Sequence, residues 1–523
     1  MKKAVFISLF GGLAVSAVLV TAQNVKGELS ADQFPGNDIG AQINAATASG
    51  RCPESKCKVA VPAGHYDFAT PVALPSGVTL ECNGKGNTTL NWTGAGGAAL
   101  TTTGTKFVAI RGCSIFAASA SPASIGIKIM KSSYIDIDAD IEGFGTSILV
   151  TGTDTVSSGN VRITGTSRNY LTAGIQLDHA VDTYITNFDN YAVARNPSHA
   201  WGLIIDTGTS GVNISQMTNG YSGTIIRNSM PSATPHGKAP NYLFADTLIN
   251  DACYSNCMQF DKSLDIGSGS RNAFYGYNYE CVDCWISGSQ IPGSVGLEID
   301  GGFGIKFIGP RIRHNNYHGI RIAGGSDVTI TDAHINANNV GRNPDGDGIR
   351  VEAGVSNWKV IGGYSSSLID YDLGGNQDYG IRIMPGNSDQ FSIISLDASR
   401  NHSGPIFNGA TGAHQTIFDV RDVNQNDVTF RSILSLEKGG TITTDESEIR
   451  PGACQKQPSL PVSGVTPSST VTWAFSGAVP PRWDAGINVF PVVSPNQVTV
   501  YLCNPKSTPV TPGSAKLNIR VIN

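Results

Sequence analysis

A short phrase returns along this chain, in which a glycine precedes aliphatic residues separated by one polar residue. The clear copies begin 23, 29 and 32 residues apart, at Gly296, Gly319, Gly348 and Gly380. Self-similarity at such a period indicates a solenoid, in which each repeat buries its apolar face against its neighbours. Alternation with period two is typical of strands. The pattern therefore predicts a parallel β-helix.

Composition agrees with an all-β fold. The 523 residues include 61 glycines, which suits many tight turns, and only 15% are charged, which excludes a disordered polyelectrolyte. One helix is expected, over residues 37–49, because Asp38 can cap it and Ile39 and Ile43 share a face. We expect this helix to cover the open end of the solenoid.

The first 22 residues have a basic start, an apolar run and small residues at the end, which predicts a signal peptide; an uncleaved anchor is the alternative. We therefore expect a secreted, periplasmic or cell-surface protein with no later membrane span. Removing two lysines would take the formal net charge from −5 to −7. An acidic chain without a basic aromatic tract argues against nucleic acid as partner.

All ten cysteines follow the leader, and an even count in an exported chain favours disulfides over metal sites. We expect Cys52 with Cys57, Cys82 with Cys113, and Cys454 with Cys503. Three pairings stay open for the group Cys253, Cys257, Cys281 and Cys284.

The segment from Phe34 to Ala46, followed by Pro62-Ala63-Gly64-His65-Tyr66, resembles the entry of the pectate-lyase-like superfamily. The later Gly-Ile-Arg-Ile phrases resemble its repeats, and the resemblance covers roughly residues 31–435. It implies a right-handed, single-stranded parallel β-helix. It implies no single activity, because lyases, glycoside hydrolases, epimerases, tailspikes and adhesins share the fold.

The domain boundaries follow from changes in pattern. We expect the capped β-helix over 23–435, interrupted by a long loop at 227–245, then a linker at 436–470 and a small β-module at 471–523.

One column of outward side chains follows from the phrase itself, since the polar residue between inward aliphatics must face out. Its members are Glu298, Arg321, Arg350 and Arg382. Stacked guanidiniums suit the carboxylates or sulfates of an acidic polysaccharide. The alternative is ordinary surface, with the arginines paired to Glu298, Glu352 or nearby aspartates.

A second column follows from aligning the other strand of each coil. It places Arg311, His334, Tyr364 and Asp397 in one ladder, with Gln290 before them. Titratable side chains are densest here, so we take as candidate catalytic residues Arg311, His314, His318, His334, Asp345 and Asp347. The competing interpretation of this region is ordinary asparagine-rich turn chemistry.

Glycoside hydrolysis needs two carboxyls about 5 to 10 Å apart. The candidate pairs are Asp345 with Asp347, Asp370 with Asp372, Glu298 with Asp300, and Glu280 with Asp283. No cofactor is expected; calcium at Asp345 and Asp347 is an alternative that no ligand spacing requires. The motif sets of typical polygalacturonases and pectate lyases are missing from the sequence.

These observations predict an exported protein that binds an extracellular polysaccharide, acidic if the arginine column is exposed, and cleaves it by hydrolysis or β-elimination. The alternative is a non-enzymatic adhesin or tailspike-like glycan-binding protein. An epimerase or fructan-converting transferase is a third interpretation, and a homotrimer stays open.

Overall fold

The computed structural model describes residues 28–51, 57–193, 199–229, 240–265, 278–367, 376–422 and 438–522, the last range with short gaps between 446 and 485. The chain forms two compact units, divided between Gly302 and Phe303. Several predicted features lie outside the described residues: the signal peptide predicted at 1–22, Cys52, and the pair Asp370 and Asp372.

The N-terminal unit opens with a cap. It contains β1 (Glu28–Ser30), a 3-10 turn η1 (Ala31–Gln33) and α1 (Ile39–Ala48). The carboxylate of Asp38 accepts a hydrogen bond from the Ala41 N–H at 2.8 Å, as expected of an N-cap. The same carboxylate accepts from the N–H groups of Ala69 and Thr70, which ties the helix to the chain directly after strand β3 (Gly64–Phe68).

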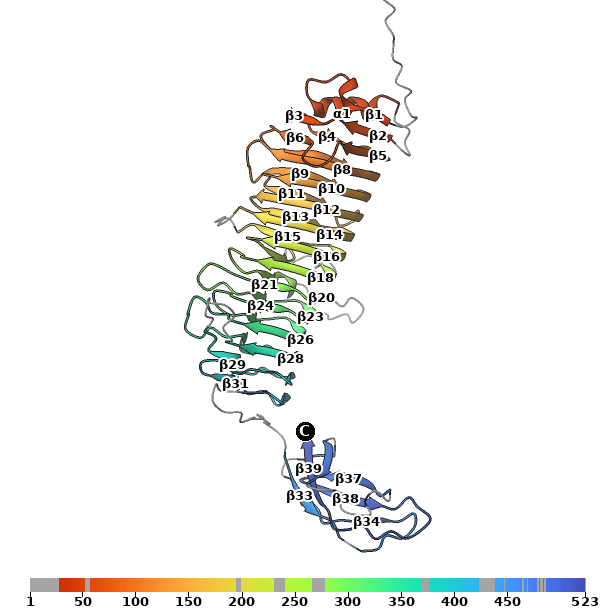
Figure 1. Cartoon of the computed structure of the whole chain (residues 1–523), viewed down its shortest axis with the longest axis vertical. Coiled ribbons are helices and arrows are strands. Elements are labelled where there is room, and N and C mark those ends of the chain that lie inside the picture. Colours follow the sequence, from red (N-terminus) through yellow and green to blue (C-terminus); the bar gives the residue numbers. More distant parts are fainter. Residues whose placement is uncertain are drawn as a thin grey trace, which may run out of the picture. The chain divides into compact units, whose positions relative to one another are not determined.

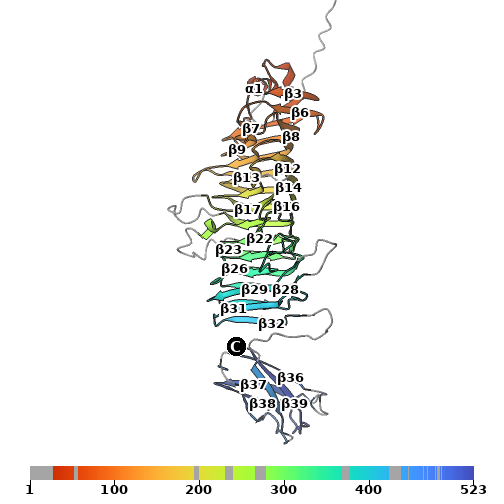
Figure 2. The ribbon, with the colours of Figure 1, turned by 90° about the vertical axis from the view of Figure 1, so that its left-hand side faces the viewer.

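Two parallel ladders follow in this unit (Figures 1 and 2). Ladder A consists of β2 (Cys57–Val61), β3 (Gly64–Phe68), β5 (Val78–Cys82), β6 (Thr88–Trp92), β8 (Lys106–Ala117), β10 (Ser133–Glu142), β12 (Ser158–Tyr170), β14 (Ala180–Ala192), β16 (Ser210–Gly220), β18 (Asn241–Asp251), β20 (Tyr279–Val282) and β21 (Trp285–Ser287). Ladder B consists of β4 (Val72–Ala73), β7 (Gly97–Thr103), β9 (Ser124–Met130), β11 (Thr146–Thr151), β13 (Ala173–Asp178), β15 (Trp201–Ile205), β17 (Gly223–Ile226), β19 (Met258–Phe260) and β22 (Leu297–Ile299). A second 3-10 turn, η2, spans Lys262–Asp265.

The second unit repeats the arrangement. Its ladder A contains β23 (Phe303–Ile308), β24 (Arg311–Arg313), β26 (Ser326–Asn336), β28 (Trp358–Ser366), β30 (Phe391–Ile394) and β32 (Gln415–Phe418). Its ladder B contains β25 (Ile320–Ile322), β27 (Ile349–Val351), β29 (Tyr379–Gly386) and β31 (Gly404–Ala410). The predicted right-handed parallel β-helix is confirmed, with one short helix among the described residues.

The core is the stack of inward side chains that the repeated phrase predicts. Ile320, Ile349 and Ile381 are opposite one another in ladder B and fully buried. Each therefore packs against the equivalent residue one coil away, at the strand spacing of about 4.8 Å. Burial of aliphatic surface in such stacks is the main stabilising contribution.

The C-terminal module is antiparallel. One sheet contains β33 (Lys438–Thr443), β36 (Thr470–Phe475) and β39 (Lys516–Ile522), and the other contains β34 (Cys454–Lys456), β35 (Leu460–Pro461), β37 (Asn488–Ser494) and β38 (Gln497–Cys503).

The boundaries of the linker and of the long loop differ from those predicted from the sequence. Residues 438–461, for which we expected a linker, contribute β33, β34 and β35 to the module, because their backbone groups pair with β38 and β39. Within the loop expected at 227–245, residues 241–245 belong to β18 and residues 230–239 lie outside the described part.

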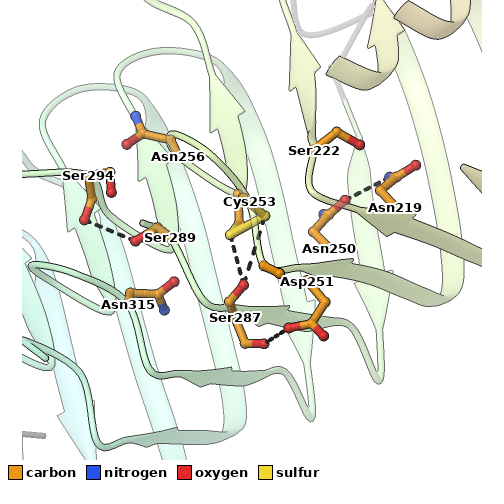
Figure 3. The surroundings of a disulfide bond; sticks show 12 residues. Asn219, Ser222, Asn250, Asp251, Cys253, Asn256, Ser287, Ser289, Ser294 and Asn315 are labelled. Carbon is orange, nitrogen blue, oxygen red and sulfur yellow. Dashed lines mark hydrogen bonds between the residues drawn. A yellow bond between two sulfur atoms is a disulfide. The ribbon is translucent and has the colours of Figure 1, made fainter. Parts of the chain in front are cut away.

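Disulfides join Cys82 with Cys113 and Cys454 with Cys503, as expected, and Cys253 with Cys257 and Cys281 with Cys284 in the group that was left open. Cys57 is also disulfide-bonded, and no described cysteine is free. The Cys253–Cys257 sulfurs lie against the carbonyl oxygen of Ser287, the nearer at 3.1 Å (Figure 3). Within the described residues, no helix is both long and apolar enough to span a bilayer.

Candidate functional site

The predicted arginine column exists in the second unit. Arg321 on β25, Arg350 on β27 and Arg382 on β29 are direct neighbours in ladder B, and Phe407 on β31 continues the column. The register therefore follows the sequence phrase through three coils.

The first two guanidiniums share one carboxylate. Glu352 accepts from Arg321 Nε at 2.9 Å and from Arg350 Nε at 3.2 Å. Arg350 Nη1 lies 3.6 Å from Asp347 Oδ2, which is an ion pair without a good hydrogen bond. The Arg350 side chain is only 14% exposed.

The third guanidinium holds three aspartates. Arg382 donates from Nε to Asp347 at 3.0 Å, from Nη1 to Asp345 at 2.8 Å, and from Nη2 to Asp378. Its guanidinium carbon also lies 4.7 Å from the centre of the Tyr379 ring. Four carboxylates thus surround three arginines, so the column corresponds to the alternative of paired arginines and not to a free cationic groove.

Asp347 is the most perturbed member of this cluster. Its side chain is fully buried. Burial raises the pKa of its carboxyl to about 7, although Arg382 and Arg350 act in the opposite direction. A carboxyl with such a pKa is partly protonated at neutral pH, unlike an ordinary aspartate.

His318 lies beneath this cluster. It is 1% exposed, and its Nδ1 accepts a hydrogen bond from the Asp347 N–H at 3.0 Å. Burial, together with Arg350, Arg321 and Arg382, lowers the pKa of His318 to about 2. The half-buried Tyr317 ring packs on the imidazole, with centres 3.7 Å apart. His318 is therefore neutral, and its imidazole contacts both the Asp347 backbone and the Tyr317 ring. These contacts suit a positioning role.

The second predicted column also has the expected register. Arg311 is opposite His334, His334 is opposite Tyr364, and Tyr364 bridges to Asp397. The His334 and Tyr364 rings stack with centres 4.8 Å apart. This column lies on ladder A, whereas the Asp347 cluster surrounds ladder B, so the candidate residues do not form one site.

The remaining candidates come from other strands and turns. His314 follows β24 in a left-handed turn with φ of 54°. Glu298 is in the N-terminal unit, 9% exposed, and accepts from Asn256 Nδ2 at 2.7 Å. Asp283 also adopts a left-handed conformation.

Among the described residues, no group of three or more His, Cys, Asp or Glu side chains could hold a metal ion. At Asp345 and Asp347, where calcium was the alternative, the Arg382 guanidinium lies between the carboxylates. The positive charge that such oxygens attract is thus supplied by the protein itself.

Sequence reasoning missed several members of the cluster. Asp378 and Tyr379 directly precede Gly380 of a repeated phrase, and Phe407 occupies the polar position of the next coil. Their position beside each phrase is a signal that could have identified them. The side chain of Phe407 is 38% exposed, so it adds an accessible aromatic surface next to Arg382.

Comparison with protein-family models finds no match, and comparison with curated proteins finds none either. Solved structures do match. One is the A-module of mannuronan C-5 epimerase AlgE6 from Azotobacter vinelandii, at 13% identity over 76% of this chain and 100% of that one, with a TM-score of 0.45.

Two bacteriophage proteins match over more of the chain. A tailspike protein mutant of E. coli bacteriophage HK620, solved with a pentasaccharide, is 10% identical over 93% of this chain and 90% of that one (TM-score 0.46). Gene product 12 of bacteriophage phi29 in its pre-mature form is 13% identical over 95% and 91% (TM-score 0.47). At these values the likeness supports no statement about activity.

Proposed function

We propose that the protein binds a polysaccharide on ladder B of its second unit and hydrolyses a glycosidic bond there. The observation behind this proposal is the fully buried carboxyl of Asp347, bonded to the same guanidinium as the exposed carboxyl of Asp345. Burial raises the pKa of Asp347 to about 7. Because both acids bond to Arg382, their separation cannot exceed about 10 Å, the upper limit of the range that glycoside hydrolases use.

The roles follow from protonation and exposure. Asp347 in its protonated form donates its proton to the glycosidic oxygen as the bond to the anomeric carbon breaks. Asp345, whose side chain is 56% exposed, accepts a proton from the attacking water or attacks the anomeric carbon itself. Arg382 keeps the two carboxyls in place.

Access requires a movement, because Asp347 is fully buried. A substrate reaches its carboxyl only after a neighbouring side chain, such as half-buried Tyr317, is displaced. The exposed ring of Phe407 and the partly exposed ring of Tyr379 lie 5.7 Å apart and offer apolar faces against which sugar C–H groups can pack.

β-Elimination fits this cluster less well. That reaction needs cations free to neutralise the uronate carboxylate and a base near neutral pKa. Here the guanidiniums are already paired with Glu352, Asp347 and Asp345, and His318 is buried with a pKa of about 2.

The test compares two substitutions at the same guanidinium. Asp345→Asn should reduce cleavage by at least about a hundredfold, whereas Asp378→Asn, which removes another Arg382 partner, should reduce it much less. Reducing ends and absorbance near 235 nm (roughly the unsaturated-uronate band) are measured together on neutral and uronate polymers, because only elimination yields the second signal. Equal losses in the two variants would contradict the assignment.

The pH profile gives an independent readout. If Asp347 is the proton donor, turnover should fall as pH rises through about 7, because only its protonated form donates.

Binding without cleavage is the second candidate function, favoured by the burial of Asp347. Retained binding with no product on any polymer of the panel would support it.

A further inference from the structure

Two aromatic side chains in the N-terminal unit are largely exposed, although burying such large apolar side chains would be favourable. Phe107, the second residue of β8, is 63% exposed, and Tyr134, the second residue of β10, is 51% exposed. Their rings stack, with centres 4.9 Å apart and planes inclined by 14°. They lie on ladder A, on a unit that contains no part of the Asp345–Asp347 cluster.

The backbone at both residues is left-handed, with φ of 59° in each case. A bulky side chain disfavours this conformation, which glycine, asparagine and aspartate adopt more readily. The protein therefore maintains two features that oppose stability, a left-handed aromatic residue and exposed apolar surface, at two successive coils.

The neighbouring coils show what the fold itself prefers at this place. The same position at the start of β12, β14 and β16 is filled by Asn160, Asp182 and Gly211, and at the start of β18 by Tyr242, all with positive φ. Since asparagine, aspartate and glycine satisfy the turn in three coils, an aromatic residue is not required by it. Strained residues without a structural need are typical of functional sites.

The surroundings define the class of ligand. Exposed Lys106 and the polar residues Ser133 and Asn160 are next to the two stacked rings along the chain or in register. A stable protein interface needs about 800 Å² from each partner, far more than two rings supply. A saccharide fits better, because its C–H face packs on an aromatic ring while its hydroxyls bond to polar neighbours.

We propose that Phe107 and Tyr134 form a second saccharide-binding platform, separate from the cluster on the second unit. It shares the ligand class of the proposed function but needs no catalysis. Its role is to hold a polysaccharide and not to cleave it.

The test replaces both rings with the residue that the fold accepts at this position. Phe107→Asn with Tyr134→Asn should leave the thermal midpoint within about 2 °C of wild type, or raise it, because asparagine tolerates the left-handed backbone. Affinity should fall about tenfold in native gels containing xylan, galactomannan, alginate or polygalacturonate. Tyr221→Asn is the matched control, since Tyr221 is also left-handed and 42% exposed but lies at another turn.

The outcomes separate the two proposals. Unchanged affinity in the double variant, a fall in affinity matched by the Tyr221 control, or a fall that only follows a lowered thermal midpoint, would overturn the platform. So would dissociation of a wild-type oligomer in sedimentation, which would indicate a contact between copies. Loss of affinity with no cleavage by wild-type protein supports the platform and contradicts the hydrolase. A wild-type protein that binds none of the four polymers contradicts both.

Discussion

Among single residues, Asp347 links the stability of the fold to pH. Its folded pKa of about 7 exceeds the ordinary value of 3.8, so the folded state binds more protons than the unfolded state between these values. Stability from this group is fully present below pH 3.8 and is lost as pH rises through 7. At 1.36 kcal/mol per unit, the change is at most about 4 kcal/mol. Asp347→Asn removes this group, so its stability relative to wild type should rise from pH 4 to pH 7 in thermal melts.

The control for this residue is Asp345→Asn, because Asp345 bonds to the same guanidinium from an exposed position. Its stability relative to wild type should change little over the same window. A stability difference between Asp347→Asn and wild type that stays constant from pH 4 to pH 7 would show that Asp347 is ionised in the folded protein throughout this range.

At the scale of elements, a buried amide ladder joins the coils of the second unit. Asn338 accepts from Asn315 Nδ2 at 2.9 Å and donates to the Ile312 carbonyl and to Gln377 Oε1, each at 3.1 Å. Asn338→Ala would remove these three hydrogen bonds between buried groups, each of which contributes about 0.5–1.5 kcal/mol. We expect a loss of about 3 kcal/mol or more, measured by denaturant unfolding. The control is Asn387→Ala, at an exposed position. Its free energy of unfolding should stay within about 0.5 kcal/mol of the wild-type value.

Strand register was predictable from the sequence, whereas the pairing of the arginines with Glu352 and nearby aspartates was only an alternative interpretation. Alternation places Arg321, Arg350 and Arg382 in one column, and matched asparagine turns align Arg311 with His334. The partners of the arginines come from turns, whose conformation has no period to detect. For the same reason, the left-handed conformations of Phe107 and Tyr134 were not predictable from the sequence.

At the scale of the whole molecule, the C-terminal module has the features of an independently folding unit. Its buried cluster draws on residues on both sides of position 470, among them Ile442, Ile449, Leu502 and Ile519. The strand β33 pairs along the whole of its length with β39, and Cys454 bonds to Cys503. A fragment of residues 438–523 should therefore melt cooperatively by circular dichroism, with no thiol titratable in the unreduced protein.

A fragment of residues 471–523 is the informative comparison, because it corresponds to the boundary that the sequence pattern favoured. It lacks β33, which leaves one edge of β39 unpaired, and it lacks Cys454, which leaves Cys503 as a free thiol. It should show no cooperative melt. In the longer fragment, Cys454→Ser should cost about 2 to 5 kcal/mol, as expected for removing a disulfide from a small domain. A shorter fragment as stable as the longer one would contradict the importance of residues 438–470 to the module.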